Sequence, residues 1–223
     1  MDKKSALIAG ATGLVGRELV RLLLDKNYYE KIVILTRREL DIKDNRLQVI
    51  IIEDFDFLDD FEEAFNVHHF YCLLGTTMKQ AKSKENFRKA DYDYPLRLAE
   101  LAKKQSNFEH FLLVTSLGAN AKSLIYYNKV KGEVEEAVSD LKLKSLKIFQ
   151  PSLLIGFRED FRLGEELGKF ASSFLSFFIV GAHRRLWTIE GKEVAKAMFN
   201  VARSHDQGQE VFKSGEIINI ARR

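Results

Sequence analysis

Three glycines near the start of the chain, Gly10, Gly13 and Gly16, have the spacing Gly-x-x-Gly-x-x-Gly. They follow the apolar run Ala6–Ala9 and lead directly into a helix-forming run, Arg17–Asp25. This order of strand, glycine turn and helix suits the pyrophosphate of a dinucleotide, because the glycines let the backbone approach the anion and the helix N-terminus offers it free N–H groups. A purely structural turn is the alternative, but a second strand after the helix favours the cofactor loop.

A tyrosine and a lysine form the second set with chemical meaning. Tyr127 and Lys131 stand four residues apart in a helix-forming run, so both side chains lie on one helix face. Ser116 precedes Tyr127 by eleven residues and follows the apolar strand Phe111–Val114. In a doubly wound sheet the carboxyl ends of the strands line the ligand crevice. We therefore expect these three side chains at one site; the alternatives are a strand-end cap for Ser116 and a surface role for Tyr127.

Apolar runs that alternate with helix-forming runs must position these groups. This alternation predicts an α/β fold, a Rossmann-type doubly wound parallel sheet with helices on both faces. A proline at position 95 predicts a kink or a break in the third helix. The expected strands are Ala6–Ala9, Ile32–Thr36, Gln48–Ile52, Phe70–Leu74, Phe111–Val114 and Leu146–Phe149, and the expected helices are Leu14–Asp25, Leu58–Phe65, Ser83–Gln105 and Leu124–Ser139.

The alternation loosens after Pro151. With no Ser/Gly-rich linker, residues 1–223 are expected to form a single NAD(P)-binding domain, in which about 151–223 are a small substrate-side elaboration. The expected elements there are a phenylalanine-rich helix at Glu165–Val180, an apolar stretch around Trp187, a helix at Gly191–Arg203 and a final strand at Glu216–Ile220.

Composition excludes several classes of protein. The 35 basic residues exceed the 32 acidic ones by only three, and the charges are interspersed, so we expect no nucleic-acid partner. No run reaches the roughly 18 apolar residues of a membrane span, so we expect no integral membrane segment. The five histidines are scattered without clustered sulfur or nitrogen ligands, and we expect no metal site. A single cysteine, Cys72, cannot form an internal disulfide, which fits a reducing cytoplasm.

Seven short motifs, spread over nearly the whole chain, together resemble the short-chain dehydrogenase/reductase superfamily, and specifically its atypical, Tat-interacting-protein-like oxidoreductase branch. The motifs are Gly10–Gly16, Thr36-Arg37-Arg38, Cys72–Thr77, Ala90–Tyr94, Ser116–Ala119, Tyr127–Glu133 and Gln150–Leu154.

The resemblance implies catalytic roles for three residues. Tyr127 would be the general acid that protonates a carbonyl oxygen, and Lys131 would strengthen this acid by its charge and hold the nicotinamide ribose. Ser116 would donate a hydrogen bond to the substrate oxygen. Many relatives carry an asparagine that supports a proton-relay water where this chain has Asp91.

The resemblance also implies contacts with the cofactor. Asp54 and Phe55 would lie beside the adenine, and Gly75 and Thr76 would line the loop over the diphosphate. The remaining positions expected to bind the cofactor are Gly10, Thr12, Gly13, Leu14, Val15, Gly16, Leu74, Tyr127, Lys131, Pro151 and Leu153.

Two arginines after the second strand, Arg37 and Arg38, bear on the choice of cofactor. NAD-binding sites use an acidic residue at this strand end for the ribose hydroxyls, whereas a 2′-phosphate needs arginine. The strand ends in Thr36-Arg37-Arg38 without an acid, which predicts NADP(H). The alternative is a solvated basic pair.

Three functions remain open at this point. The first is an NADPH-dependent oxidoreductase that acts on a small apolar carbonyl or alcohol, because the aromatic residues between Phe157 and Trp187 would give the nicotinamide end an apolar cover. Those rings could instead pack the fold or bury a homodimer interface. The second is an NADPH-binding regulator that acts through a protein partner. Epimerisation or dehydration of a nucleotide sugar is less favoured, because residues 151–223 leave little room for a lobe that grips a nucleotide.

Overall fold

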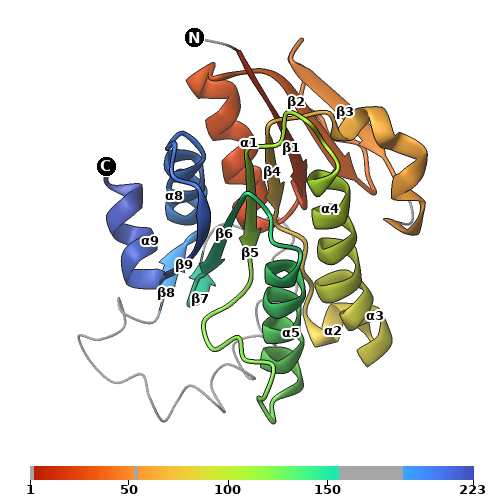
Figure 1. The fold of residues 1–223 in the computed structure, drawn as a ribbon, viewed down its shortest axis with the longest axis vertical. Coiled ribbons are helices and arrows are strands. Elements are labelled where there is room, and N and C mark those ends of the chain that lie inside the picture. Colours follow the sequence, from red (N-terminus) through yellow and green to blue (C-terminus); the bar gives the residue numbers. More distant parts are fainter. Residues whose placement is uncertain (1–2, 53–54, 156–187) are drawn as a thin grey trace.

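Seven parallel strands form the central sheet of the protein (Figure 1). The computed structural model describes residues 3–52, 55–155 and 188–223. In the sheet the strand order is β3-β2-β1-β4-β5-β6-β9. The strands are β1 (Lys4–Ala9), β2 (Tyr29–Thr36), β3 (Leu47–Ile51), β4 (His69–Cys72), β5 (His110–Val114), β6 (Ser145–Gln150) and β9 (Gly208–Lys213). The predicted α/β Rossmann-type fold is confirmed.

The strand order reverses between β1 and β4. From β1 the chain builds outward to β2 and β3, and it then returns to place β4 on the other side of β1. Such a reversal leaves a crevice beyond the carboxyl ends of the two central strands, where doubly wound sheets bind their ligands. The glycine loop after β1 and the segment after β4 both begin at this edge.

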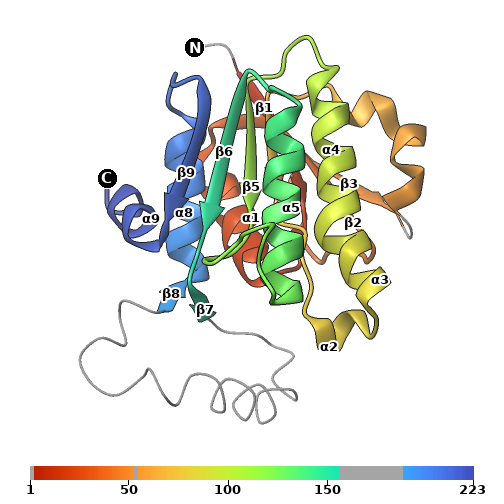
Figure 2. The same cartoon turned by 60° about the horizontal axis from the view of Figure 1, so that its bottom comes forward.

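Helices cover both faces of the sheet (Figure 2). Helices α1 (Leu14–Lys26) and α8 (Gly191–Ala202) lie on one face, while α4 (Tyr94–Lys103) and α5 (Tyr126–Asp140) lie on the other. Because both faces are covered, the inner strands are almost entirely buried, whereas the edge strands β3 and β9 are partly or largely exposed. The smaller elements are the 3₁₀ segment Phe55–Phe65, α2 (Met78–Ala81), α3 (Lys84–Arg88), the π-helical turn Lys89–Asp93, the strands β7 (Leu153–Ile155) and β8 (Thr188–Glu190), and α9 (Ser214–Ala221).

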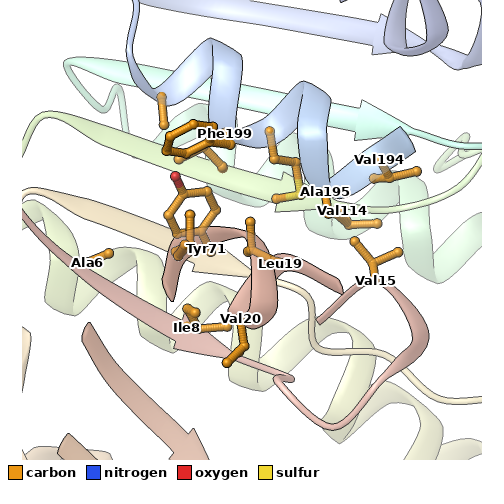
Figure 3. Packing of buried hydrophobic residues seen from close by; sticks show 14 of the residues in the cluster. Ala6, Ile8, Val15, Leu19, Val20, Tyr71, Val114, Val194, Ala195 and Phe199 are labelled. Atoms are coloured by element: carbon orange, nitrogen blue, oxygen red, sulfur yellow. The ribbon is translucent and has the colours of Figure 1, made fainter. Parts of the chain in front are cut away.

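One core cluster joins α1 and α8 to the sheet. Figure 3 shows Leu19 of α1 and Phe199 of α8 directed toward Tyr71 of β4, and all three side chains are buried. Helix α8 begins at Gly191, where an added Cβ would lie 3.1 Å from Leu14 Cγ at the start of α1. This close packing fixes the first turn of α1, and with it the glycine loop, against the sheet.

The expected strand at Glu216–Ile220 is wrong, because these residues belong to helix α9. The last strand is instead β9, which pairs in parallel with β6. The isoleucines in this stretch favour a strand by composition, but the Glu216 carboxylate accepts a hydrogen bond from the Lys213 N–H at 2.8 Å and starts the helix. Ile217 then buries its side chain in the core that α8 shares.

The predicted third helix does not break at the proline: the backbone is helical from Lys84 to Lys103, and a π-helical turn inside it interrupts the regular α-helical hydrogen bonding. Pro95 lies in the first turn of α4, and the π-helical turn Lys89–Asp93 directly precedes it. The Tyr94 N–H bonds to the carbonyl of Lys89, five residues earlier. This wider turn suits Pro95, because in a regular α-helix the proline ring would clash with the carbonyl four residues earlier. The expected helix at Leu58–Phe65 is a 3₁₀ segment that starts at Phe55, and β7 and β8 have no counterpart among the expected elements. The expected helix Glu165–Val180 and Trp187 lie outside the described residues.

Candidate functional site

The glycine loop after β1 turns sharply and packs against the end of β4. Gly10 has a φ of +93°, and an added Cβ would lie 2.5 Å from the carbonyl oxygen of Leu73. An added Cβ on Gly16 would lie 2.2 Å from the carbonyl oxygen of Gly10. Neither position has room for a side chain, so the expected tight turn and the expected close helix packing are both present.

The first turn of α1 is suited to an anion. Gly13 is the N-cap residue and places no side-chain acceptor on the first-turn amides, and this turn contains no acidic residue. The amides of the turn are therefore available to a pyrophosphate, which the helix dipole also favours. Thr12 is exposed beside the loop, and its carbonyl accepts a hydrogen bond from Arg17 Nε at 3.0 Å. This loop fits the pyrophosphate of a dinucleotide.

A buried ion pair lies at the carboxyl end of the central strands. Lys131 Nζ, from α5, is 2.7 Å from Asp91 Oδ1, in the π-helical turn, and the exposed fractions of the two side chains are 5% and 0%. The other carboxylate oxygen of Asp91 accepts a hydrogen bond from the Thr76 N–H at 2.8 Å. An added Cβ on Gly75 would lie 3.3 Å from both Lys131 Nζ and Asp91 Oδ1. The loop after β4 is thus held directly over the charged pair.

The electrostatics of the pair keep the lysine charged. Burial raises the pKa of Asp91, and the Lys131 charge and the Thr76 N–H offset this only in part. Burial acts to lower the pKa of Lys131, but the attraction of Asp91 and of Tyr127 outweighs it, so the pKa of Lys131 is raised. A fixed positive charge therefore lies within the electrostatic reach of Tyr127.

Tyr127 and Ser116 are the other two residues of the predicted catalytic set. The Tyr127 ring packs on Phe87 of α3, with ring centroids 5.5 Å apart, which holds the tyrosine one turn before Lys131 on α5. Ser116 follows β5, and its Oγ is buried without a hydrogen-bond partner among the described residues. A buried polar atom without a partner is uncommon in folded proteins, which distinguishes this hydroxyl from the other polar groups at the strand ends.

The other predicted cofactor positions differ in what their side chains contact. Arg37 and Arg38 follow β2 and are exposed, and the Thr36 hydroxyl holds their turn through the Arg38 backbone. The Phe55 ring is buried against Tyr94, with centroids 5.2 Å apart, so its side chain belongs to the core and only its backbone remains for an adenine. Asp54 lies outside the described residues.

The remaining predicted positions lie along the same edge of the sheet. Val15 is buried in the core, whereas Leu74 is partly exposed after β4. The carbonyl of Pro151 accepts a hydrogen bond from the Leu117 N–H at 2.8 Å, which joins the ends of β6 and β5. Leu153 of β7 is exposed.

The pairing of Asp91 with Lys131 is the main feature that the sequence does not indicate. The two residues are forty positions apart, and they meet where the π-helical turn packs against α5. The sequence nevertheless contains one indication that this position is unusual, since an aspartate stands where many members of the resembled superfamily carry an asparagine. A buried lysine requires a counter-charge, and Asp91 supplies it.

Comparison with known proteins identifies the family. The family model described as "NAD dependent epimerase/dehydratase family" matches residues 6–130, from β1 into α5. The chain belongs to this family. Its relatives include the protein HTATIP2 of Rattus norvegicus, which is 34% identical over 100% of this chain and 91% of the relative. The mitochondrial protein FMP52 of Debaryomyces hansenii is 35% identical over 70% of this chain and 69% of the relative. The resemblance drawn from the sequence motifs is confirmed.

Solved structures of proteins with bound NAD share the fold. MoeE5, in complex with UDP-glucose and NAD, superposes with a TM-score of 0.69 and 17% identity over 97% of this chain and 80% of that chain. A short-chain dehydrogenase/reductase superfamily protein from Agrobacterium tumefaciens, with bound NAD, superposes with a TM-score of 0.68 and 13% identity over 94% and 76%. At these identities the likeness concerns the fold alone. Family membership and the glycine loop together make this chain an NAD(P)-binding, short-chain dehydrogenase/reductase-like protein.

Two absences concern only the part of the chain that the structure describes. Within residues 3–52, 55–155 and 188–223, His, Cys, Asp and Glu side chains form no group of three that could hold a metal ion. The same residues include no helix that is long and apolar enough to span a membrane.

Proposed function

We propose that the protein is an NADPH-dependent oxidoreductase that reduces a small apolar carbonyl compound, or oxidises the matching alcohol, through Ser116, Tyr127 and Lys131. One observation carries this proposal. The Ser116 hydroxyl is buried and unpartnered among the described residues, at the end of β5, while α5 presents Tyr127 one turn before a buried, charged Lys131. This arrangement supports a site in which Ser116 is a hydrogen-bond donor for a carbonyl oxygen, Tyr127 a proton donor and Lys131 a fixed cation.

Each residue has a step that its chemistry allows. The Ser116 hydroxyl donates a hydrogen bond to the carbonyl oxygen and so orients the substrate. The Tyr127 hydroxyl gives its proton to that oxygen as negative charge develops on it. Lys131 stabilises the tyrosinate that remains, and Asp91 holds the ammonium group in place. NADPH, when bound, supplies the hydride to the carbonyl carbon.

The cofactor is held mainly by backbone. The first-turn amides of α1 would bind the pyrophosphate, and the glycines at positions 10 and 16 keep this loop close to the strands. The exposed Arg37 and Arg38 favour NADPH over NADH, because a guanidinium can form charge-assisted hydrogen bonds with a 2′-phosphate. Lys131 would contact the nicotinamide ribose.

A substrate panel with matched tyrosine variants tests the proposal. NADPH binding is measured first by fluorescence titration, and NADPH oxidation is then followed with aliphatic and aromatic aldehydes and ketones. Tyr127→Phe should lower turnover roughly 10²–10⁴-fold while NADPH binding stays intact. Tyr126→Phe is the control, because its hydroxyl bonds to the Lys84 carbonyl at 3.0 Å, away from Lys131. NADPH binding without any Tyr127-dependent turnover would overturn the enzymatic proposal and favour a regulator that acts through a protein partner.

UDP-glucose belongs in the same panel, because the solved structure of MoeE5 contains it together with NAD. We expect no conversion of this nucleotide sugar. The cytoplasmic location stays a prediction, and the FMP52 relatives are named as mitochondrial proteins.

A further inference from the structure

A polar cluster that the proposed reaction does not use joins three elements behind the site. Thr115 is the first residue after β5 and directly precedes Ser116, while Gln150 is the last residue of β6. Both side chains bond to the carboxylate of Glu135 on α5. The Thr115 hydroxyl donates to Glu135 Oε1, and Gln150 Nε2 lies 3.0 Å from Oε1 and 2.9 Å from Oε2. One carboxylate therefore binds two strand ends to one helix.

The position of Glu135 on α5 connects this cluster to the candidate site. Tyr127, Lys131 and Glu135 are spaced four residues apart along α5, so they lie on the face of the helix that turns toward the strand ends. Backbone hydrogen bonds also join the ends of β5 and β6 on both sides of the cluster. The Thr115 N–H donates to the Phe149 carbonyl at 2.9 Å, and the Leu117 N–H donates to the Pro151 carbonyl at 2.8 Å.

The contact is selective for a carboxylate. Thr115 and Gln150 both present donors, and a carboxylate offers acceptor sites on two oxygens to receive them. Hydrogen bonds to an ionised acceptor are stronger and shorter than neutral ones, so this contact resists displacement of the strand end. Glu133 and Glu136 on the same helix make different contacts: Glu133 pairs with Arg88, and Glu136 is exposed.

The geometry points to Glu135 as a positioning residue that sets the place of Ser116 relative to Tyr127 and Lys131. This inference rests on the proposed function for its catalytic consequence. The Glu135 carboxylate holds Thr115, the neighbour of Ser116, while its own helix carries the tyrosine and the lysine. Loss of the carboxylate would let the end of β5 shift against α5. A misplacement of about 1 Å in a catalytic site can lower the rate on the order of 10²-fold.

Five variants test this inference in the full-length protein, and one of them is the single variant E135Q. Glu135→Ala removes the acceptor, and Thr115→Val removes one donor at nearly constant volume. The double variant E135Q/Q150E exchanges the two side chains. An amide and a carboxylate then face each other again, with the amide on α5 and the carboxylate on β6. Glu136→Gln is the matched control, because Glu136 neighbours Glu135 on α5 and its side chain is exposed. Each variant is measured for thermal midpoint, NADPH affinity, and kcat and KM for a carbonyl substrate found in the panel.

A positioning role predicts a specific pattern of kinetics. Glu135→Ala should lower kcat by about tenfold or more while the NADPH affinity changes less than about twofold, because the first-turn amides of α1 are untouched. The exchanged pair should recover most of the kcat that E135Q alone loses, and Glu136→Gln should match the wild type. A lower thermal midpoint with unchanged kcat below the transition, or an exchanged pair no better than E135Q, would overturn the inference.

Hydrogen exchange gives a readout that does not depend on turnover. The Leu117 N–H donates to the Pro151 carbonyl after β6, and the Ala119 N–H donates to the Ser116 carbonyl within the loop that follows β5. These amides should exchange faster in Glu135→Ala than in the wild type or in Glu136→Gln. If the wild-type protein reduces no carbonyl, the proposed function fails, and the exchange rates still decide whether Glu135 holds the Ser116 loop. Equal exchange in all three proteins would show that it does not.

Discussion

Lys131 Nζ and Asp91 Oδ1 are 2.7 Å apart in a site where both side chains are almost fully buried. The pair joins helix α5 to the π-helical turn, and the Thr76 N–H on the second carboxylate oxygen adds the loop after β4. The lysine that would serve the reaction is therefore held by a carboxylate and not by solvent. Both its charge and its position depend on Asp91.

Asp91→Asn should destabilise the protein and lower turnover. The amide can still accept the Thr76 N–H, but it leaves a buried ammonium without a counter-charge. Breaking a buried pair by removing one partner costs about 3–5 kcal/mol of unfolding free energy. Urea unfolding of D91N, K131M and the double variant forms a double-mutant cycle. We expect the double variant to be less destabilised than the sum of the single variants, whereas additive effects would show that the pair is not coupled.

Arg37→Ala should weaken NADPH binding by about tenfold or more and leave NADH binding unchanged. A hydrogen bond to a charged group contributes about 1.5–3 kcal/mol, and about 1.4 kcal/mol corresponds to a tenfold change in affinity. Arg21→Ala on α1 is the control, since Arg21 is exposed and pairs with Glu18. Fluorescence titration with each cofactor gives the affinities. Equal affinities of the wild type for NADPH and NADH would contradict the assignment of the 2′-phosphate to this arginine.

Gly16→Ala should destabilise the protein and weaken cofactor binding together. The added Cβ would lie 2.2 Å from the Gly10 carbonyl oxygen, and because this contact is with backbone the loop has to shift. Overpacking of this kind costs about 1–3 kcal/mol. Gly215→Ala in α9 is the same change where an added Cβ meets nothing within 4 Å, and helix propensity there favours alanine by up to about 1 kcal/mol. The midpoint temperature of unfolding should therefore fall in Gly16→Ala and rise in Gly215→Ala. Similar shifts in the two variants would falsify the packing argument.

Local sequence patterns predict the part of the site that is local in structure. The glycine loop and the helix after it depend on neighbouring residues, so their spacing alone indicated the turn that Gly10 and Gly16 form. The contact between Asp91 and Lys131 depends on a π-helical turn and on two elements that meet only in the folded protein. Glu135 likewise gains its partners from the ends of β5 and β6, which no spacing within α5 reveals.

The C-terminal segment that forms β9 and α9 shows a different limit of prediction from sequence. The residues of α9 include three isoleucines, which are as compatible with a buried strand as with a helix. The start of the helix depends on the hydrogen bond between the Glu216 carboxylate and the Lys213 N–H, and the strand depends on pairing with β6. A prediction from apolar composition alone therefore assigned the strand to the wrong side of Ser214.

Buried histidines at the opposite end of the sheet predict a response to acid. His110 is buried, its Nδ1 is 2.7 Å from Ser145 Oγ, and its Nε2 is 3.1 Å from the Ser204 carbonyl. Burial, aided by repulsion from His69, lowers the pKa of His110 to about 4. Nearby, hydrogen bonding to His69, together with Lys4, lowers the pKa of Glu109 to about 2. These groups lie at the N-terminal ends of β4 and β5, away from the proposed site.

The free energy of unfolding should fall as the pH drops from about 6.5 to about 4, because the unfolded histidine takes up a proton in this range while folded His110 does not. Below about 4.5 the Glu109 contribution is lost as well, since its folded pKa lies under its unfolded value. Urea unfolding at pH 7 and pH 5 measures the change. His110→Asn removes one of the titrating groups and should reduce the slope between these values, and part of the slope should remain because burial also lowers the pKa of His69. His205→Asn, at an exposed loop position, is the control variant. An unchanged slope in His110→Asn would assign the acid response to other groups.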